Sequence, residues 1–250
     1  MDLRGKGAII IGARRVGVTV AKRLADEGVN LAITYRRSKT QALALRRQVA
    51  PHVKKAAVVQ CDVADEESVK RMVDDAVREL GSVHFVINLA SDFRMTPFHT
   101  LDAEAWESMM AQAKGSYFVG VHAGKHLIRN PGPTRGHIIL FGDSSAGATP
   151  YHGYLPYLTA KAAIEFMTRA FALELAEHRV LVNAISPGPT MRPPDLSADI
   201  WKNQVLAGTP LKRQSDAKDI AEMVVALLKS ETITGETIRV DSGVHLAGHG

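Results

Sequence analysis

The chain has 250 residues, of which 46% are hydrophobic and 23% charged, a composition that fits one folded α/β domain and excludes a disordered protein. Its formal charge of +5 reflects either an ordinary basic surface or a preference for anionic ligands such as a phosphorylated cofactor. Because the lysines and arginines are dispersed along the chain, we expect no nucleic-acid partner.

Short apolar runs of strand length alternate with segments of helical periodicity along the chain. In chain order the expected elements are a strand at Ala8–Ile11, a helix at Val18–Glu27, a strand at Asn30–Tyr35, a helix at Lys39–Val49, a strand at Ala57–Cys61, a helix at Asp65–Leu80, a strand at Val83–Leu89, a helix at Ala103–Ile128, a strand at His137–Phe141, a helix at Tyr157–His178, a strand at Val180–Ile185, a helix at Asp216–Leu228 and a strand at Thr237–Val240. Strands that are apolar throughout and joined by helices predict a parallel sheet covered on both faces. Right-handed crossovers make it a doubly wound, Rossmann-type sheet of about seven strands, and we expect a single domain over residues 1–250.

Cysteine content and hydropathy exclude further classes of site and partner. Cys61 is the only cysteine, so the chain cannot form an intramolecular disulfide or a zinc site built on thiolates. We therefore expect no metal site and a reducing, cytoplasmic environment. No apolar run approaches the roughly 20 residues that a membrane-spanning helix needs, so we expect no membrane partner.

A glycine-containing turn separates the first expected strand from the first expected helix. Its residues are Gly12, Ala13, Arg14, Arg15, Val16 and Gly17. Glycines at this place let the backbone approach a pyrophosphate, which then binds at the helix N-terminus. The loop therefore indicates dinucleotide binding, with a plain strand–helix turn as the alternative.

The second expected strand ends in Tyr35, Arg36 and Arg37, where a fold that prefers NAD usually has an acidic residue. The two arginines, with Arg14 or Arg15, have the guanidinium geometry that clamps a 2′-phosphate. They therefore favour NADP(H) as the cofactor. The alternative is that they are ordinary surface arginines with no role in cofactor binding.

Tyr157 and Lys161 lie four residues apart in an expected helix, so their side chains share one face, one turn apart. A free phenol has a pKa of about 10, and a neighbouring ammonium typically lowers it by roughly one to three units. The pair could then donate and retake a proton, as carbonyl reduction requires. Ser144 lies 13 residues before Tyr157 and could reach the same substrate oxygen, unless it is only a turn serine.

Further segments occur in the order and at the intervals of a known enzyme family. With Gly12–Gly17, Ser144, Tyr157 and Lys161, they are Asp62-Val63, Asn88-Leu89-Ala90-Ser91, Val182–Gly188, Thr209–Arg213, Asp219–Ala221 and Thr234–Gly243. From end to end the chain resembles the short-chain dehydrogenase/reductase family. The resemblance implies that Tyr157 is the acid/base, that Ser144 orients the substrate and that Lys161 also holds the nicotinamide ribose.

The resemblance also implies which residues contact the cofactor. Pro187 and Gly188 would flank the nicotinamide. Asn88, Leu89 and Ala90 would belong to the cofactor site, as would Val63. Asp62 either meets the adenine or only caps the following helix.

Two segments resemble the pteridine reductase-like branch, which uses NADPH. They are Arg14–Gly17 in the glycine loop and Pro150–Tyr157 before the expected catalytic helix. Members of that branch often carry Asp where other members of the family carry Ser. Asp143 directly precedes Ser144, so a one-residue slip would exchange the two, and the spacing to Tyr157 favours Ser144.

The chain departs from the family pattern at the cofactor loop and in the expected proton relay. Ile11 replaces the usual Thr, and the loop from Gly12 to Gly17 is one residue shorter than in the pteridine reductase-like pattern. The usual Asn-Asn-Ala-Gly becomes Asn88–Ser91, and the helix-four Asn of the relay corresponds to Gln112.

We therefore expect an NADPH-dependent oxidoreductase that transfers a hydride to a carbonyl or pteridine C=N group of a small molecule, with Gln112 beside the catalytic Ser144, Tyr157 and Lys161. A 3-oxoacyl-thioester or general ketone reductase is the alternative. A catalytically weak NADP-binding sensor or scaffold is a second alternative, motivated by the altered loop and by Gln112. Because family members are commonly tetramers, we expect a homotetramer.

Three aromatic residues lie in segments that follow expected strands. Tyr151, Tyr154 and Trp201, with the loop Pro189–Leu206, either line a substrate pocket or simply pack the loop. The proline-rich segment Pro187–Pro194 is interpreted as an active-site loop rather than a domain boundary.

Overall fold

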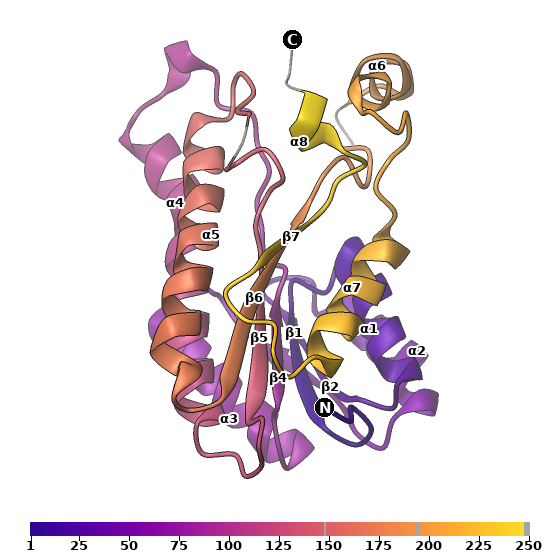
Figure 1. Ribbon diagram of the computed structural model, residues 1–250, viewed down its shortest axis with the longest axis vertical. Coiled ribbons are helices and arrows are strands. Elements are labelled where there is room, and N and C mark those ends of the chain that lie inside the picture. The colour runs from indigo at the N-terminus through magenta and orange to yellow at the C-terminus, as the bar shows by residue number, and fades with distance from the viewer. Residues whose placement is uncertain (148, 194–195, 248–250) are drawn as a thin grey trace.

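The fold is a single seven-stranded sheet with helices on both faces (Figure 1). The computed structural model describes residues 1–147, 149–193 and 196–247. Neighbouring strands are parallel, in the order β3-β2-β1-β4-β5-β6-β7. The strands are β1 (Gly7–Ile11), β2 (Asn30–Tyr35), β3 (Ala56–Gln60), β4 (Phe85–Asn88), β5 (Gly136–Phe141), β6 (Val180–Pro187) and β7 (Thr237–Val240). The predicted doubly wound parallel sheet is confirmed.

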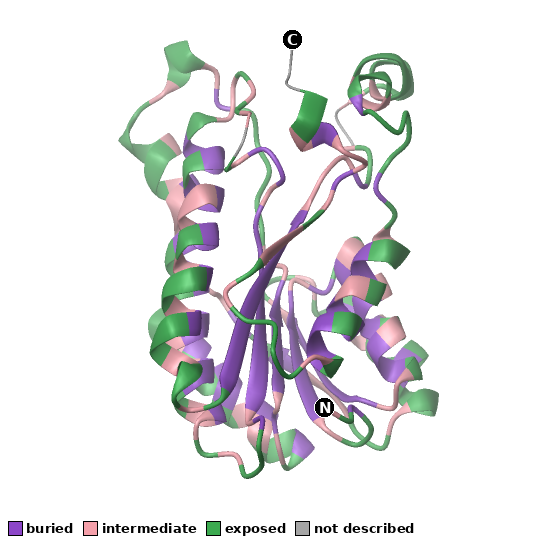
Figure 2. Ribbon diagram, in the orientation of Figure 1, coloured by how far each residue is buried: buried purple, intermediate pink, exposed green. Residues whose placement is uncertain are grey.

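Six long helices divide into two groups, one on each face of the sheet (Figure 1). One face carries α1 (Val16–Asp26), α2 (Lys39–Val49) and α7 (Ala217–Lys229). The other face carries α3 (Glu66–Leu80), α4 (Ala103–Leu127) and α5 (Leu155–Ala176). Central strands are buried on both sides, as Figure 2 shows, because each face packs against its own set of apolar helix residues.

Sequence signals at helix ends explain where several helices begin and end. Asp65 caps α3 by accepting from the backbone N–H of Glu67, and Gly81 ends that helix in the left-handed conformation. Asp102 and Asp216 cap α4 and α7 in the same way. Each of these predicted helices therefore lies within one or two residues of its expected bounds.

The segment from Pro189 to Leu206 is more ordered than the loop expected there. It contains the short helix α6 (Ala198–Ile200), which is followed by the π-helical turn Trp201–Leu206. The hydroxyl of Ser197 caps α6 by accepting from the backbone N–H of Ile200 at 3.1 Å. Pro194 and Asp195, which belong to the expected loop, lie outside the described residues. Three other short helices were not expected: η1 (Ala50–His52), η2 (Phe98–Thr100) and α8 (Val244–Ala247).

The strand order places a candidate site at one edge of the sheet. Chain order reverses between β1 and β4, and ligands of such sheets bind outside the carboxyl ends of the strands at this switch point. The glycine loop, the residues after β4 and the residues after β5 all leave the sheet at this edge. In the part of the chain that the structure describes, none of the helices is long and apolar enough to cross a membrane.

Candidate active site

The hydroxyl of Tyr157 lies against a carboxylate. Tyr157 is in the first turn of α5 and is only 5% exposed. Its phenol donates a hydrogen bond of 2.9 Å to Oδ2 of Asp143, two residues beyond the end of β5. The hydroxyl of Tyr151 donates to the same oxygen at 3.3 Å. Asp143 is therefore the group that the loop after β5 presents to the phenol.

Of the two adjacent candidates, Asp143 and Ser144, it is Asp143 whose side chain is hydrogen-bonded to Tyr157, although the spacing in the sequence favours Ser144. Asp143 begins a tight turn in which its Oδ1 accepts from the backbone N–H of Ser145 at 2.9 Å. The other carboxylate oxygen then faces the phenol. Ser144 is buried, and its backbone N–H donates to the carbonyl of Pro187 at 3.2 Å. The turn decides which side chain reaches Tyr157. Counting residues from Tyr157 back to Ser144 cannot predict it, because the count contains no information about the turn.

Lys161 lies one helical turn after Tyr157, as predicted, and its ammonium is hydrogen-bonded to a backbone carbonyl. Its Nζ donates to the carbonyl of Phe141 at 2.9 Å and lies 5.7 Å from the centre of the Tyr157 ring. Burial lowers the pKa of Lys161 to about 8, while the carboxylates of Asp143 and Glu165 act in the opposite direction. The amine is thus a buried group whose charge depends on its carboxylate neighbours.

The pKa of Tyr157 is shifted in the direction opposite to the sequence-based expectation. Burial raises it well above the value of a free phenol, and the negative charge of Asp143 raises it further. A hydrogen-bonding interaction with Ser91 acts in the lowering direction. The phenol of Tyr157 therefore stays protonated and donates a hydrogen bond to Asp143. It is arranged to act as an acid.

An aromatic wall adjoins the phenol. Phe93, in the loop after β4, stacks on Tyr154 with the ring centres 4.6 Å apart and meets the ring of Tyr157 edge-on at 5.1 Å. The two loops are joined by a hydrogen bond of 2.7 Å from the backbone N–H of Thr96 to the carbonyl of Gly153. Phe93 is 45% exposed, so part of this side chain is accessible to solvent. The sequence does not mark Phe93 as a site residue except by its place two residues after the Asn88–Ser91 segment.

Ser91 and Gln112 form a second polar group beside the phenol. The hydroxyl of Ser91 donates to Oε1 of Gln112 at 3.1 Å. Gln112 is buried in α4, and among the described residues its Nε2 has no hydrogen-bond partner. The predicted site residue Gln112 is therefore connected to the site through its hydrogen bond with Ser91.

The glycine loop has a geometry that requires glycine. Gly12 has a φ of +82°, and a Cβ there would lie 2.7 Å from the backbone nitrogen of Ala90 and from the carbonyl carbon of Leu89. A Cβ on Gly17 would collide with the carbonyl oxygen of Gly12. The ends of β1 and β4 can approach closely for this reason, and no side chain caps the N-terminus of α1. This arrangement fits the phosphates of a dinucleotide.

The candidate phosphate-binding arginines differ in whether their guanidinium groups are hydrogen-bonded within the protein. Arg36 and Arg37 follow β2 and are exposed, like Arg14 in the glycine loop. Within residues 1–147, 149–193 and 196–247, no ion pair or side-chain hydrogen bond engages these three guanidinium groups. Arg15 instead donates to the backbone carbonyl of Met191, in the segment after β6.

Comparison with known proteins decides the family. The family model described as Enoyl-(Acyl carrier protein) reductase matches residues 12–245. The 3-oxoacyl-[acyl-carrier-protein] reductase FabG of Staphylococcus aureus is 31% identical over 246 residues, which cover 96% of this chain and 98% of that protein. The chain belongs to the short-chain dehydrogenase/reductase family. It is therefore an oxidoreductase.

Two solved structures of this family have closely similar folds. The FolM alternative dihydrofolate reductase 1 of Brucella canis, complexed with NADP, is 27% identical with a TM-score of 0.88, and the match covers 98% of this chain and 96% of that one. A short-chain dehydrogenase of Burkholderia cenocepacia in complex with NADP is also 27% identical with a TM-score of 0.88, covering 98% and 99%.

The family segment after β4 links the glycine loop to α4. Asn88 is buried, its Nδ2 donates to the hydroxyl of Ser116 at 3.1 Å, and its Oδ1 accepts from the backbone N–H of Ala90 at 3.2 Å. The backbone N–H of Leu89 donates to the carbonyl of Ile11 at 2.8 Å. Asn88, Leu89 and Ala90 thus lie together against the loop that the sequence predicts to bind the cofactor.

The segment after β3 has a structural role in this short-chain dehydrogenase. Oδ1 of Asp62 accepts from the backbone N–H of Ala64 at 3.1 Å, within the turn that leads to α3. The helix cap itself is Asp65, so Asp62 shapes the turn rather than capping the helix. Val63 packs against Gly115 of α4, where a Cβ would lie only 2.8 Å from Cγ2 of Val63.

Pro187 and Gly188 lie at the carboxyl end of β6, next to the Asp143 turn. The carbonyl of Pro187 accepts from Ser144, and the backbone N–H of Gly188 donates to the carbonyl of Val240 at 3.1 Å. A Cβ on Gly188 would lie 2.7 Å from Cα of Asp241, so the backbone passes closely between β7 and the site. Trp201 belongs to the π-helical turn and is partly buried.

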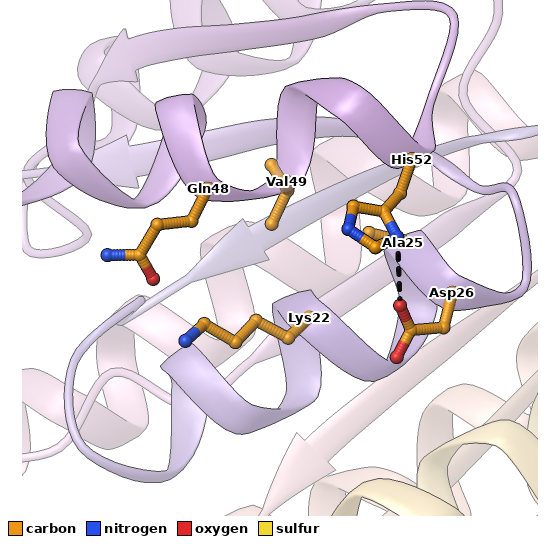
Figure 3. Close-up of a pocket in the computed structure, with 6 residues that line it drawn as sticks. All are labelled: Lys22, Ala25, Asp26, Gln48, Val49 and His52. Atoms are coloured by element: carbon orange, nitrogen blue, oxygen red, sulfur yellow. Dashed lines mark ion pairs between the residues drawn. The ribbon is translucent and has the colours of Figure 1, made fainter.

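A separate surface hollow lies between α1 and α2 (Figure 3). Its lining residues are Lys22, Ala25, Asp26, Gln48, Val49 and His52. An ion pair of 3.1 Å joins Nδ1 of His52 to Asp26 across it. Because α1 begins at the carboxyl edge of the sheet and runs away from it, this hollow lies toward the opposite edge, remote from Tyr157.

Proposed function

We propose that this member of the short-chain dehydrogenase/reductase family is an NADPH-dependent reductase that transfers a hydride to a carbonyl or pteridine C=N group, with Tyr157 as general acid/base. The observation that carries the proposal is the 2.9 Å hydrogen bond from the buried Tyr157 phenol to Asp143, just beyond the carboxyl end of β5. A protonated phenol oriented by a carboxylate can deliver the proton that must accompany a hydride.

NADP(H) is the cofactor that the site supports. The close approach around Gly12 leaves room for phosphate at the start of α1, and the exposed guanidinium groups of Arg14, Arg36 and Arg37 provide positive charge for a 2′-phosphate. Two structural neighbours were solved with NADP bound. When bound, the reduced nicotinamide supplies the hydride, and Pro187 and Gly188 would flank it.

The side chains around Tyr157 have distinct roles in proton transfer. Tyr157 gives its proton from the phenol oxygen to the substrate nitrogen or oxygen as the adjacent carbon is reduced. Asp143 accepts from the phenol and fixes its orientation before the transfer. Lys161, as an ammonium, stabilises the phenolate that forms and would hold the nicotinamide ribose.

On this proposal, Ser91 and Gln112 take the place of the family's proton relay, in which the position of Gln112 is usually an Asn. Before the transfer, the hydroxyl of Ser91 donates to Gln112. When Tyr157 becomes a phenolate, the same hydroxyl can turn to donate to it, which agrees with the lowering effect of Ser91 on the Tyr157 pKa. Ser144 is buried beside Pro187 and supports the turn, although the sequence favours it as the substrate-orienting residue.

Within the proposed function, the substrate favoured by the site is a planar nitrogen heterocycle such as a dihydropteridine. Reduction of C=O places negative charge on oxygen, which hydroxyl donors stabilise and a carboxylate does not. Asp143 instead suits N–H donors and a protonated C=N nitrogen. The partly exposed ring of Phe93 adds an aromatic group with which such a heterocycle could stack. The FolM relative carries the name of a dihydrofolate reductase.

A 3-oxoacyl-thioester reductase is the second candidate, because 3-oxoacyl-[acyl-carrier-protein] reductases of Staphylococcus are about 30% identical over nearly the whole chain. A panel of NADPH oxidation assays with 7,8-dihydrobiopterin, acetoacetyl-coenzyme A and a simple cyclic ketone separates the two. We expect the highest kcat/KM with the dihydropteridine. Preference for acetoacetyl-coenzyme A would establish the alternative instead.

Tyr157→Phe tests the catalytic assignment. It should retain NADPH binding and lose at least about 10²-fold in turnover, since it removes the general acid but keeps the ring. Turnover close to that of the unmodified enzyme would rule out Tyr157 as the acid. Tight NADPH binding by the unmodified protein without turnover of any probe would favour a sensor or scaffold.

We also propose a cytoplasmic homotetramer. Three large apolar side chains, Tyr117, Phe166 and Leu173, are exposed on the outer surfaces of α4 and α5. Neighbouring exposed apolar side chains of this kind are typical of a protein–protein interface. Association through this face would cover them. Sedimentation equilibrium measures the assembly directly, and Phe166→Glu should shift it toward smaller species.

A further inference from the structure

Glu165 is a buried carboxylate for which the proposed mechanism has no role. It lies on α5, four residues after Lys161, and is 8% exposed. Charged side chains are almost never this buried unless they are paired and hydrogen-bonded. Among the described residues, none forms an ion pair within 4.0 Å of Glu165. Its position therefore needs an explanation from the groups that surround it.

One carboxylate oxygen of Glu165 joins α5 to β6. The hydroxyl of Ser186, which is fully buried, donates to Oε1 of Glu165 at 2.6 Å. Charge-assisted hydrogen bonds of this length are about twice as strong as neutral ones. The two residues thus form a link between the catalytic helix and the strand that continues to Pro187 and Gly188.

The turn that carries Asp143 passes directly over this carboxylate. A Cβ on Gly142 would lie 2.7 Å from Oε1 of Glu165, and a Cβ on Gly147 would lie 2.9 Å from Oε2. Both glycines flank Asp143 in the chain. The turn therefore passes close to the Glu165 carboxylate at two points, and a side chain at either glycine would displace that carboxylate.

The charge of Glu165 also faces the catalytic amine. The groups around Lys161 are the carbonyl of Phe141 at the end of β5, Asp143 in the turn, and Tyr157 and Glu165 on α5. Glu165 interacts with Lys161 and with Ser186 on β6. The Cβ position of Gly147, which lies 2.9 Å from Oε2 of Glu165, is also 3.9 Å from the guanidinium of Arg239 on β7. Glu165 and Asp143 are the two carboxylates that favour the ammonium form of Lys161.

We propose that Glu165 is a positioning residue of the active site, which supports the Gly142–Gly147 turn so that Asp143 meets Tyr157 and which holds Lys161 as an ammonium. The inference rests on the proposed catalytic roles of Asp143, Tyr157 and Lys161. Two substitutions separate its parts. Glu165→Gln removes the charge and keeps an acceptor for Ser186, whereas Ser186→Ala removes the hydrogen bond and keeps the charge.

Nuclear magnetic resonance of the intact protein tests the charge without any substrate. Lysines are labelled with carbon-13 at Cε, and the Lys161 signal is identified as the one lost in Lys161→Met. We expect it to titrate near pH 8 in the unmodified protein, and about one unit lower in Glu165→Gln, the smaller end of the effect of a neighbouring opposite charge. Glu174→Gln, the same change at an exposed position of α5, should leave it unchanged.

Turnover of 7,8-dihydrobiopterin with NADPH tests the positioning. Both Glu165→Gln and Ser186→Ala should lower kcat by about tenfold or more with little change in KM, because a small displacement of a catalytic group is costly. Unchanged titration of Lys161 in Glu165→Gln would overturn the charge assignment. Wild-type kcat in Ser186→Ala would overturn the positioning role, and this variant also decides it if Glu165→Gln does not fold. If no probe is turned over, the proposed function fails, and the titration still decides the role of Glu165.

Discussion

Asp143 and Ser144 are adjacent, and replacing each in turn shows which of them acts on Tyr157. The phenol donates to Asp143 at 2.9 Å from a position that is only 5% exposed, and Asp143→Ala removes this acceptor. A hydrogen bond to a charged group contributes about 1.5–3 kcal/mol, and about 1.4 kcal/mol corresponds to a factor of ten. We expect Asp143→Ala to lower kcat by roughly 10- to 100-fold. Ser144→Ala should change kcat by less than about threefold, because its hydroxyl is not bonded to the phenol.

The assay is the initial rate of NADPH oxidation with 7,8-dihydrobiopterin, together with NADPH affinity measured by fluorescence. Affinity for NADPH should stay close to that of the unmodified protein in both variants, which separates loss of catalysis from loss of cofactor. Asp143→Asn should also lower the pKa of Tyr157, because the charge of Asp143 raises it. A large loss in Ser144→Ala with normal turnover in Asp143→Ala would refute the assignment.

Three other predictions concern the cofactor site and stability. Arg36→Ala combined with Arg37→Ala should weaken NADPH by about tenfold or more and NADH far less, as measured by fluorescence titration; equal losses would mean that neither arginine contacts the 2′-phosphate. Gly12→Ala should lower the free energy of unfolding, measured in urea, by about 2 kcal/mol or more. The new Cβ would lie 2.7 Å from backbone atoms, and the φ of +82° is strained for alanine. Gly208→Ala is the control and should be nearly neutral, because no atom lies within 4 Å of its Cβ position. Burial lowers the pKa of His137, which is 0% exposed, to about 4. His137 is neutral in both the folded and the unfolded protein above pH 6.5, the usual pKa of His. As the pH falls from 6.5 to 4, the unfolded chain takes up a proton at His137 before the folded protein does, so the free energy of unfolding should fall by about 3 kcal/mol. Urea unfolding across this range should show a smaller loss in His137→Leu, and an equal loss in both proteins would contradict the assignment.

Local sequence signals determined most of the fold and the general place of the site. Apolar strands that alternate with helices of regular periodicity specify a parallel sheet, because each face must be covered by the helices that connect the strands. Asp65 and Gly81 set the ends of α3 through contacts with their immediate neighbours. Gly12 and Gly17 marked the loop after β1, and the spacing of Tyr157 and Lys161 placed both on one face of α5.

The chemistry within the site was decided by contacts between segments that are distant in the chain. The turn after β5 brings Asp143 rather than Ser144 to Tyr157, and burial together with that carboxylate reverses the expected direction of the Tyr157 pKa shift. Phe93 reaches the site because the loop after β4 is bonded to the loop before α5. Desolvation and charge depend on everything that surrounds a group in space, and spacing along one helix or loop does not contain that information.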